Sequence, residues 1–296
     1  PGRGYLLGCH AFALEETGDY ARAALTGRAA LTLAPDDAWG LHAVTHVYDM
    51  TADARGGLDW LEGREAAWIH CNNFGFHVWW HKALMLLDLG RMDEALDLYD
   101  TRIRSEKTDD YRDISNATSL LSRLELEGVD VGRRWEELAD LSEKRTEDGC
   151  LIFADLHYLL ALTNDGREGA TARMMARLAA DAARSGTEIE RLMAVPGLNA
   201  ARGLEAFGDG DYGTAFAALA RARPHMQGAG GSHAQRDVFE RLTIDAGLRA
   251  GQLTEAQAIL ADRTARRGGY EDAYAAARRD LIARAENVSC PKGASA

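Results

Sequence analysis

The sequence predicts an all-α protein, a right-handed α/α superhelix of about seven helix pairs. Three observations predict this fold. The 296 residues include only five prolines and are rich in Ala, Leu, Arg and Glu, which favour helices. Apolar residues recur at i, i+3 and i+4 along most of the chain, as in amphipathic helices. Short polar turns also recur, spaced from 35 residues (Gly18 to Asp53) to 44 residues (Asp165 to Asp209).

Each turn separates a first helix from a second one, and such a pair buries its apolar face only by stacking on neighbouring pairs. A second helix is expected after each turn, and a last helix at about 270–286. We expect one domain over residues 1–286 and a frayed tail over 287–296. The first helices are expected near residues 3–17, 37–51, 74–89, 112–127, 152–163, 197–207 and 233–249.

The first helix pair carries the clearest repeat signature. The segment from Phe12 to Pro35, with Gly18-Asp19-Tyr20 at its turn, closely follows the tetratricopeptide pattern. Its small Ala side chains let antiparallel helices approach closely, and Pro35 closes the second helix because proline cannot continue it. We therefore expect the helix pairs to be tetratricopeptide-like.

Composition excludes several classes of protein. The 34 Lys+Arg against 46 Asp+Glu give a net charge of −12, which argues against a nucleic-acid partner because phosphate binding needs a cationic face. No apolar run is long enough to span a membrane, and no signal peptide is evident. The four cysteines do not suggest a disulfide framework, so we expect a cytoplasmic protein. The chain lacks an initiator Met, and we expect that an N-terminal part precedes it.

Histidines are the most informative polar residues. His42 and His46 are four residues apart in the first helix of the second pair. His77 and His81 repeat this spacing in the first helix of the third pair. Residues at i and i+4 share one helix face, and two such pairs on neighbouring helices could meet. In four of the first five pairs, the first helix has a histidine at nearly the same number of residues before the turn, and therefore at nearly the same height along the helix. These histidines are His10, His46, His81 and His157.

Two kinds of chemistry suit these histidines. Four neutral imidazoles, His42, His46, His77 and His81, could hold a divalent transition metal such as zinc, iron or nickel. Alternatively, His46 or His81 is a general base whose pKa is set by a neighbouring carboxylate, with Asp113 the acidic partner. The structural alternative is that the imidazoles only pack between helices beside Trp79 and Trp80.

Two further segments are candidates for ligand binding. Asp113 and Asn116 lie one turn apart at the start of the first helix of the fourth pair. They would face the groove, or they would only cap that helix. The Gly-rich stretch 227–232 ends at Ser232, which forms a predicted capping box with Gln235. The helix that begins there could bind an anion through its N-terminus and Arg236, or Arg236 and Asp237 could belong to a structural Arg–Asp network.

Six runs of the chain combine solenoid positions with unusual His and Trp placements: 12–20, 37–47, 77–84, 119–126, 129–135 and 231–237. On these runs the chain resembles the tetratricopeptide repeat protein 38 family over nearly its whole length, from about Tyr5 to about Ala285. One departure is Ser122, where that family usually has Trp. The resemblance implies an all-helical superhelix and marks the same polar residues, without implying an established reaction.

Two functions follow from these patterns. In the first, a concave pocket binds a small molecule or a metal and carries His/Asp acid–base chemistry, capped by the segment 233–237 if the superhelix closes tightly. The alternative is a non-enzymatic scaffold that binds a peptide or protein segment in its groove. The catalytic candidates are His46, His81 and Asp113, and the ligand-binding candidates are His10, His42, His77, Trp80, Asn116, His157, Gln235, Arg236 and Asp237.

Overall fold

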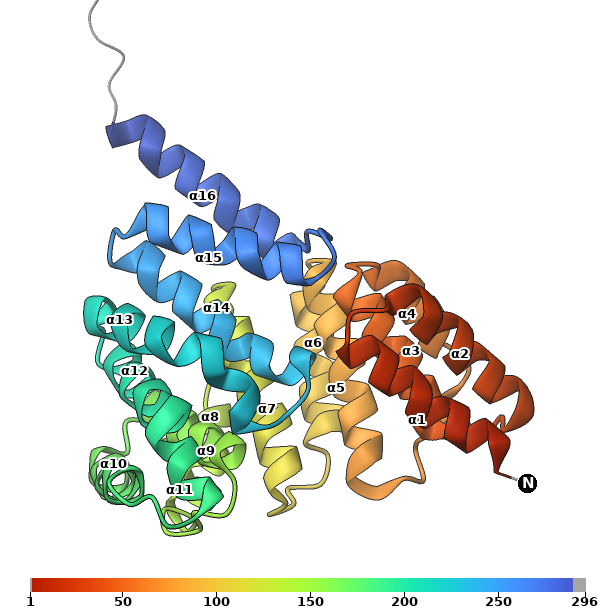
Figure 1. The fold of residues 1–296 in the computed structure, drawn as a ribbon, viewed down its shortest axis with the longest axis horizontal. Helices are drawn as coiled ribbons and strands as arrows, with labels where there is room; N and C mark the ends of the chain where they lie inside the picture. The colour runs from red at the N-terminus through yellow and green to blue at the C-terminus, as the bar shows by residue number, and fades with distance from the viewer. Residues whose placement is uncertain (1, 290–296) are drawn as a thin grey trace, which may run out of the picture.

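A computed structural model describes residues 2–289, and every regular element in that range is a helix (Figure 1). The first helices of the seven pairs agree with prediction to within about two residues. They are α1 (Arg3–Glu16), α3 (Ala38–Met50), α5 (Asn72–Asp88), α7 (Tyr111–Leu126), α9 (Ile152–Asn164), α12 (Leu198–Gly208) and α14 (His233–Arg249). The all-α solenoid predicted from the periodicity is therefore confirmed.

The second helices follow the turns as expected. They are α2 (Tyr20–Leu33), α4 (Ala54–Leu61), α6 (Met92–Leu98), α8 (Arg134–Glu143), α10 (Glu168–Ala182), α13 (Tyr212–Ala222) and α15 (Leu253–Arg266). A short helix that was not predicted, α11 (Glu188–Leu192), follows α10. The last helix, α16 (Ala273–Ser289), runs three residues past its predicted end. The rest of the predicted tail, 290–296, lies outside the described residues.

Polar residues at the turns explain where many of these helices begin. The carboxylates of Asp19, Asp53 and Asp211 each accept a hydrogen bond from the backbone N–H three residues later, which satisfies a donor that a helix N-terminus otherwise leaves free. The capping box predicted at α14 is present. Ser232 Oγ accepts from Gln235 N at 3.3 Å, and Gln235 Oε1 accepts from Ser232 N at 3.0 Å.

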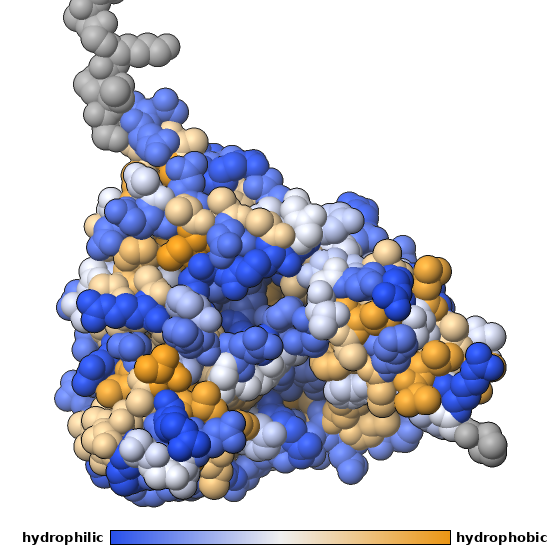
Figure 2. All heavy atoms as spheres, in the orientation of Figure 1, coloured by the Kyte–Doolittle hydropathy of each residue, from blue (hydrophilic) through white to orange (hydrophobic). Residues whose placement is uncertain are grey.

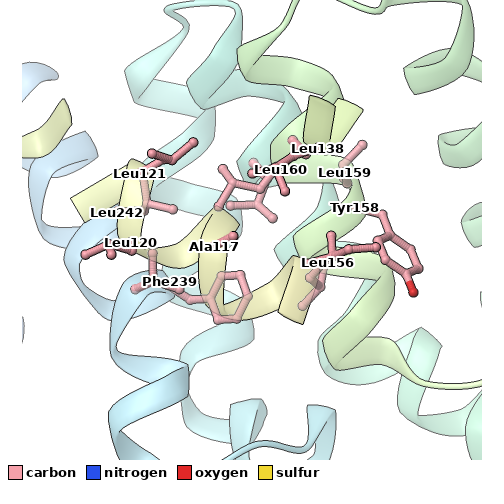
Figure 3. Packing of buried hydrophobic residues seen from close by; sticks show 14 of the residues in the cluster. Ala117, Leu120, Leu121, Leu138, Leu156, Tyr158, Leu159, Leu160, Phe239 and Leu242 are labelled. Atoms are coloured by element: carbon pink, nitrogen blue, oxygen red, sulfur yellow. The ribbon is translucent and has the colours of Figure 1, made fainter. Parts of the chain in front are cut away.

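The largest hydrophobic core lies where α7 packs between its neighbours (Figure 3). Ala117, Leu120 and Leu121 of α7 meet leucines of α8 and α9 on one side and Phe239 and Leu242 of α14 on the other. α14 also packs against α3. The first helices therefore converge on one another, and this convergence positions the polar residues described below.

The two ends of the chain meet across the concave side. The backbone N–H of His233 donates to Glu16 Oε1 at 3.1 Å, and the Tyr20 hydroxyl donates to the Arg266 carbonyl at 3.4 Å. Ala273 N donates to Asp88 at 2.7 Å. Figure 2 shows a hydrophilic hollow between the N-terminal helices on the right and the C-terminal helices on the left. The superhelix is thus closed tightly, as the capped pocket requires.

Candidate metal centre

Four imidazoles from α3 and α5 meet at one buried point. His42 Nε2 lies 3.0 Å from His46 Nε2, 3.0 Å from His77 Nε2 and 3.2 Å from His81 Nε2, and the last two are 3.2 Å apart. The ring centroids of His46 and His81 are 4.4 Å apart. His42, His46 and His81 are buried, and His77 is partly buried. The two predicted HxxxH pairs therefore do face each other.

This spacing suits a metal ion. Histidine nitrogens lie about 2.0–2.1 Å from zinc, so two ligands of a tetrahedral ion are about 3.3 Å apart. The four ligand nitrogens all lie within 4.8 Å of one another. The Nε2 contacts of 3.0–3.2 Å are close to the spacing that one tetrahedral ion requires.

Acceptor oxygens lie near the Nδ1 atoms of two of the rings. Glu15 Oε2 lies 3.3 Å from His46 Nδ1, and both side chains are fully buried. Asn116 Oδ1 lies 3.2 Å from His77 Nδ1, and it can only accept, so Nδ1 carries the proton. An acceptor on Nδ1 places the lone pair on Nε2, which is how metal-binding histidines are usually oriented. Trp80 stacks on His77, with the planes 15° apart and the centroids 5.3 Å apart.

Burial keeps three of the four rings neutral. It lowers the pKa of His77 to about 3 and holds the pKa values of His42 and His81 well below their usual range, with the charge of His46 adding to each shift. Burial alone would also lower the pKa of His46, but the nearby Glu15 carboxylate outweighs it and raises that pKa. Neutral imidazole is the form that binds a metal.

The cluster opens onto a cavity of about 370 Å³ through His42 and His77, whereas His46 and His81 lie behind them. Asn116 and Gln235, both predicted to bind a ligand, also line this cavity. Gly231, Ser232 and Gln235 also line it, so of the predicted cap 233–237 only Gln235 reaches this cavity. The remaining walls are mostly aromatic and are formed by Phe12, Glu16, Trp39, Asn73, Phe74, Tyr111, Arg112, Leu151 and Phe153.

Four other candidates lie away from that cavity. His10 is exposed on α1. His157 is buried, donates from Nδ1 to the Phe153 carbonyl at 2.7 Å and packs on Phe239. The predicted row of histidines at one height therefore does not form, because only the rings of α3 and α5 reach a common point. Arg236 and Asp237 line a second, neighbouring cavity of about 370 Å³.

Asp237 forms the ion pairs that the structural alternative foresaw. Arg263 and Arg241 bind its carboxylate at 2.6 and 2.7 Å, and Arg263 also binds Asp272 at 2.6 Å. Arg236 lies 3.9 Å from Glu16, which lines both cavities.

Asp113 and Trp80 contact residues of the site without lining the cavity. Asp113 is fully buried, accepts from Asn73 Nδ2 at 2.6 Å and is also bound by the Thr108 hydroxyl. Burial raises the pKa of Asp113. The indole N–H of Trp80 donates to Ser119 Oγ at 3.1 Å. Neither side chain lines the cavity, so both position its lining residues.

Sequence reasoning overlooked Glu15 and Arg123. Glu15 lies four residues after Ala11 and three after Phe12, on a helix face that is otherwise buried, and this register was the available signal. Arg123 is buried on α7, where it donates to the Ser119 and Ala234 carbonyls at 3.0 and 2.8 Å and lies 5.5 Å from the centroid of the Trp80 ring. The sequence around Arg123, Ser-Arg-Leu-Glu, did not indicate that this arginine would be buried.

Comparison with models of known protein families finds no match. Among solved structures, the chain is similar to a tetratricopeptide repeat protein from Parabacteroides merdae. The two share 15% sequence identity with a TM-score of 0.49, over 95% of this chain and 100% of the other. In residues 2–289, none of the helices is long and apolar enough to cross a bilayer.

Proposed function

We propose that this protein binds a divalent transition metal through His42, His46, His77 and His81 and presents it to a small molecule in the adjoining cavity. The observation that carries the proposal is the convergence of four Nε2 atoms at 3.0–3.2 Å contacts. Buried polar groups require partners, and a metal satisfies four otherwise competing lone pairs at once.

The donor set favours a borderline transition metal over a hard cation. Imidazole suits zinc, copper, nickel and iron, whereas magnesium and calcium prefer oxygen ligands. The nearby carboxylate of Glu15 adds negative charge beside the site, which further favours a cation. Free thiols at Cys9, Cys71 and Cys150 support a reducing compartment, and we propose a cytoplasmic location.

In this proposal His46 and His81 are metal ligands and not general bases. Both rings are fully buried behind His42 and His77, so neither reaches a molecule in the cavity. Asp113 is likewise a positioning residue, because its carboxylate holds Asn73 on the cavity wall. Any reaction at this site would depend on the metal and not on an independent His/Asp pair.

The peptide-binding scaffold is the second candidate and has less support. A peptide groove needs an open concave face, but α14 packs against α3 and α7, and Glu16 binds the start of α14. We also propose kinship with the tetratricopeptide repeat protein 38 family, supported by the runs quoted above.

Metal stoichiometry tests the proposed function. Protein purified without an affinity tag is stripped with a chelator, titrated with Zn²⁺ or Co²⁺, and analysed for bound metal. We expect one ion per chain, its loss in the double variant His46→Ala/His81→Ala, and its retention in His10→Ala/His225→Ala, which removes two exposed histidines. No stoichiometric metal in the wild type, or equal binding by both double variants, contradicts the proposal.

A further inference from the structure

The cavity beside the four histidines has a composition that defines its ligand. We infer that it binds an aromatic carboxylate, whose carboxylate oxygen becomes a fifth ligand of the metal between His42 and His77 and whose ring lies among Phe12, Trp39 and Phe74. This inference rests on the proposed metal site. It adds a ligand class, and the argument for it comes from the other residues of the cavity.

The apolar wall is suited to a flat ring. Trp39 lies 4.8 Å from Phe12 and 5.6 Å from Phe74 between ring centroids, and the three rings surround His42. Aromatic rings prefer offset or edge contacts at such distances, and Trp39 keeps 37% of its surface exposed. A cavity of about 370 Å³ lies at the small end of the range for ligand sites, so a single substituted ring fits it.

An unpartnered amide identifies the polar end of the ligand. Asn116 is buried, and its Oδ1 faces the Nδ1 atom of His77. Its Nδ2 group has no hydrogen-bond partner, although buried donors are rarely left unpaired. Asn116 contacts His77 and lines the cavity, so its unpaired amide is available to an oxygen of a ligand bound there.

Gln235 supplies a second amide on the cavity wall. Its Oε1 accepts from the backbone N–H of Ser232, so its Nε2 group is the part left to interact with a ligand. Two amide donors and a metal cation together match a group with two acceptor oxygens and a negative charge. Glu16, which also lines the cavity, is bound by His233 N and lies 3.9 Å from Arg236, so its charge is partly offset.

Carboxylate binding to the Co²⁺ protein tests this inference. Benzoate and acetate are titrated while the visible spectrum of the cobalt is followed. We expect benzoate to bind at least about tenfold more tightly than acetate, a difference of about 1.4 kcal/mol, because only benzoate contacts the aromatic wall. Trp39→Ala should remove this preference, while Tyr5→Ala, at an exposed aromatic residue outside the cavity, should keep it.

Two isosteric substitutions separate the ligand from the metal. Asn116→Asp and Gln235→Glu each keep the acceptor oxygen that faces His77 or Ser232 and replace the amide donor by a second oxygen. We expect both variants to bind one Co²⁺ and to lose about tenfold or more in benzoate affinity. Equal affinity for benzoate and acetate, or full benzoate affinity in both variants, overturns the inference and leaves the metal site standing. Failure of the wild type to bind Co²⁺ overturns the proposed function itself.

Discussion

Glu15 and His46 form a fully buried carboxylate–imidazole contact, with Oε2 3.3 Å from Nδ1. The two residues come from neighbouring helices, α1 and α3, and the opposite nitrogen of the same ring faces His42. A carboxylate in this position orients a metal-binding histidine and increases its basicity. The arrangement explains why a carboxylate is buried beneath the histidine cluster.

Removing the charge of Glu15 should weaken the metal site. We expect Glu15→Gln to fold and to bind Zn²⁺ about 10–100-fold more weakly, as for other carboxylates behind metal ligands. Competition with a chromophoric chelator measures the affinity. Glu62→Gln, at an exposed position, is the control and should bind as the wild type does. Unchanged affinity in Glu15→Gln would mean that Glu15 does not act on the cluster.

A close approach of α2 and α3 near the histidines depends on Gly27. A Cβ atom there would lie 2.5 Å from Val44 Cγ2 and 3.3 Å from the Gly40 carbonyl oxygen. We expect Gly27→Ala to lower the free energy of unfolding by about 1–3 kcal/mol through overpacking, despite the higher helix propensity of Ala. Denaturant titration measures the change.

Gly169→Ala is the matched comparison for Gly27. Gly169 also lies within a helix, α10, but only the end of the Arg173 side chain lies near its missing Cβ, at 3.7 Å. This variant should be unchanged or more stable by about 0.5–1 kcal/mol. If both variants change stability equally, crowding between α2 and α3 is not the cause.

Arg123 is a buried arginine that joins α7 to α14. Burial lowers its pKa to about 9, and its guanidinium binds the Ser119 and Ala234 carbonyls. We expect Arg123→Met to lower the free energy of unfolding by about 1–3 kcal/mol because two charge-assisted hydrogen bonds are lost. The exposed Arg221→Met should leave stability unchanged. A stability gain in Arg123→Met would show that burying the charge costs more than its hydrogen bonds contribute.

The ion-pair network around Arg263 predicts a loss of stability in acid. Burial alone would raise the pKa values of Asp237 and Asp272, but Arg263 and its neighbouring arginines outweigh burial and hold both pKa values low. A depressed pKa contributes stability above the unfolded value of about 3.9, and this stability is lost as the pH falls through the native value. Unfolding followed between pH 2 and 7 should therefore show a decline below about pH 4.

Asp272→Asn separates this network from other carboxylates. Breaking a buried ion pair costs about 3–5 kcal/mol, so we expect a loss of that order at pH 7 and a shallower decline in acid. Asp280→Asn, at an exposed residue, should keep the wild-type profile. An acid decline of the same depth in Asp272→Asn would assign acid sensitivity to other groups.

The sequence by itself determined the helices and the faces on which the chemistry lies. Ala-rich apolar periodicity and turn residues such as Asp19 and Ser232 act locally, so the bounds of the first helix of each pair followed from them. The i, i+4 spacing of His42/His46 and His77/His81 fixed each pair to one face, because helix geometry requires it.

Only the tertiary structure decided which faces meet. Packing of α3 on α5 brought four imidazoles together and left His10 and His157 elsewhere, although these two have heights along their helices similar to those of His46 and His81. Packing of α14 against α3 and α7 placed Gln235 on the cavity wall, whereas Asp237 forms an ion pair with Arg263. Contacts between residues far apart in sequence depend on the summed packing angles of many helix pairs, and local patterns do not carry that information.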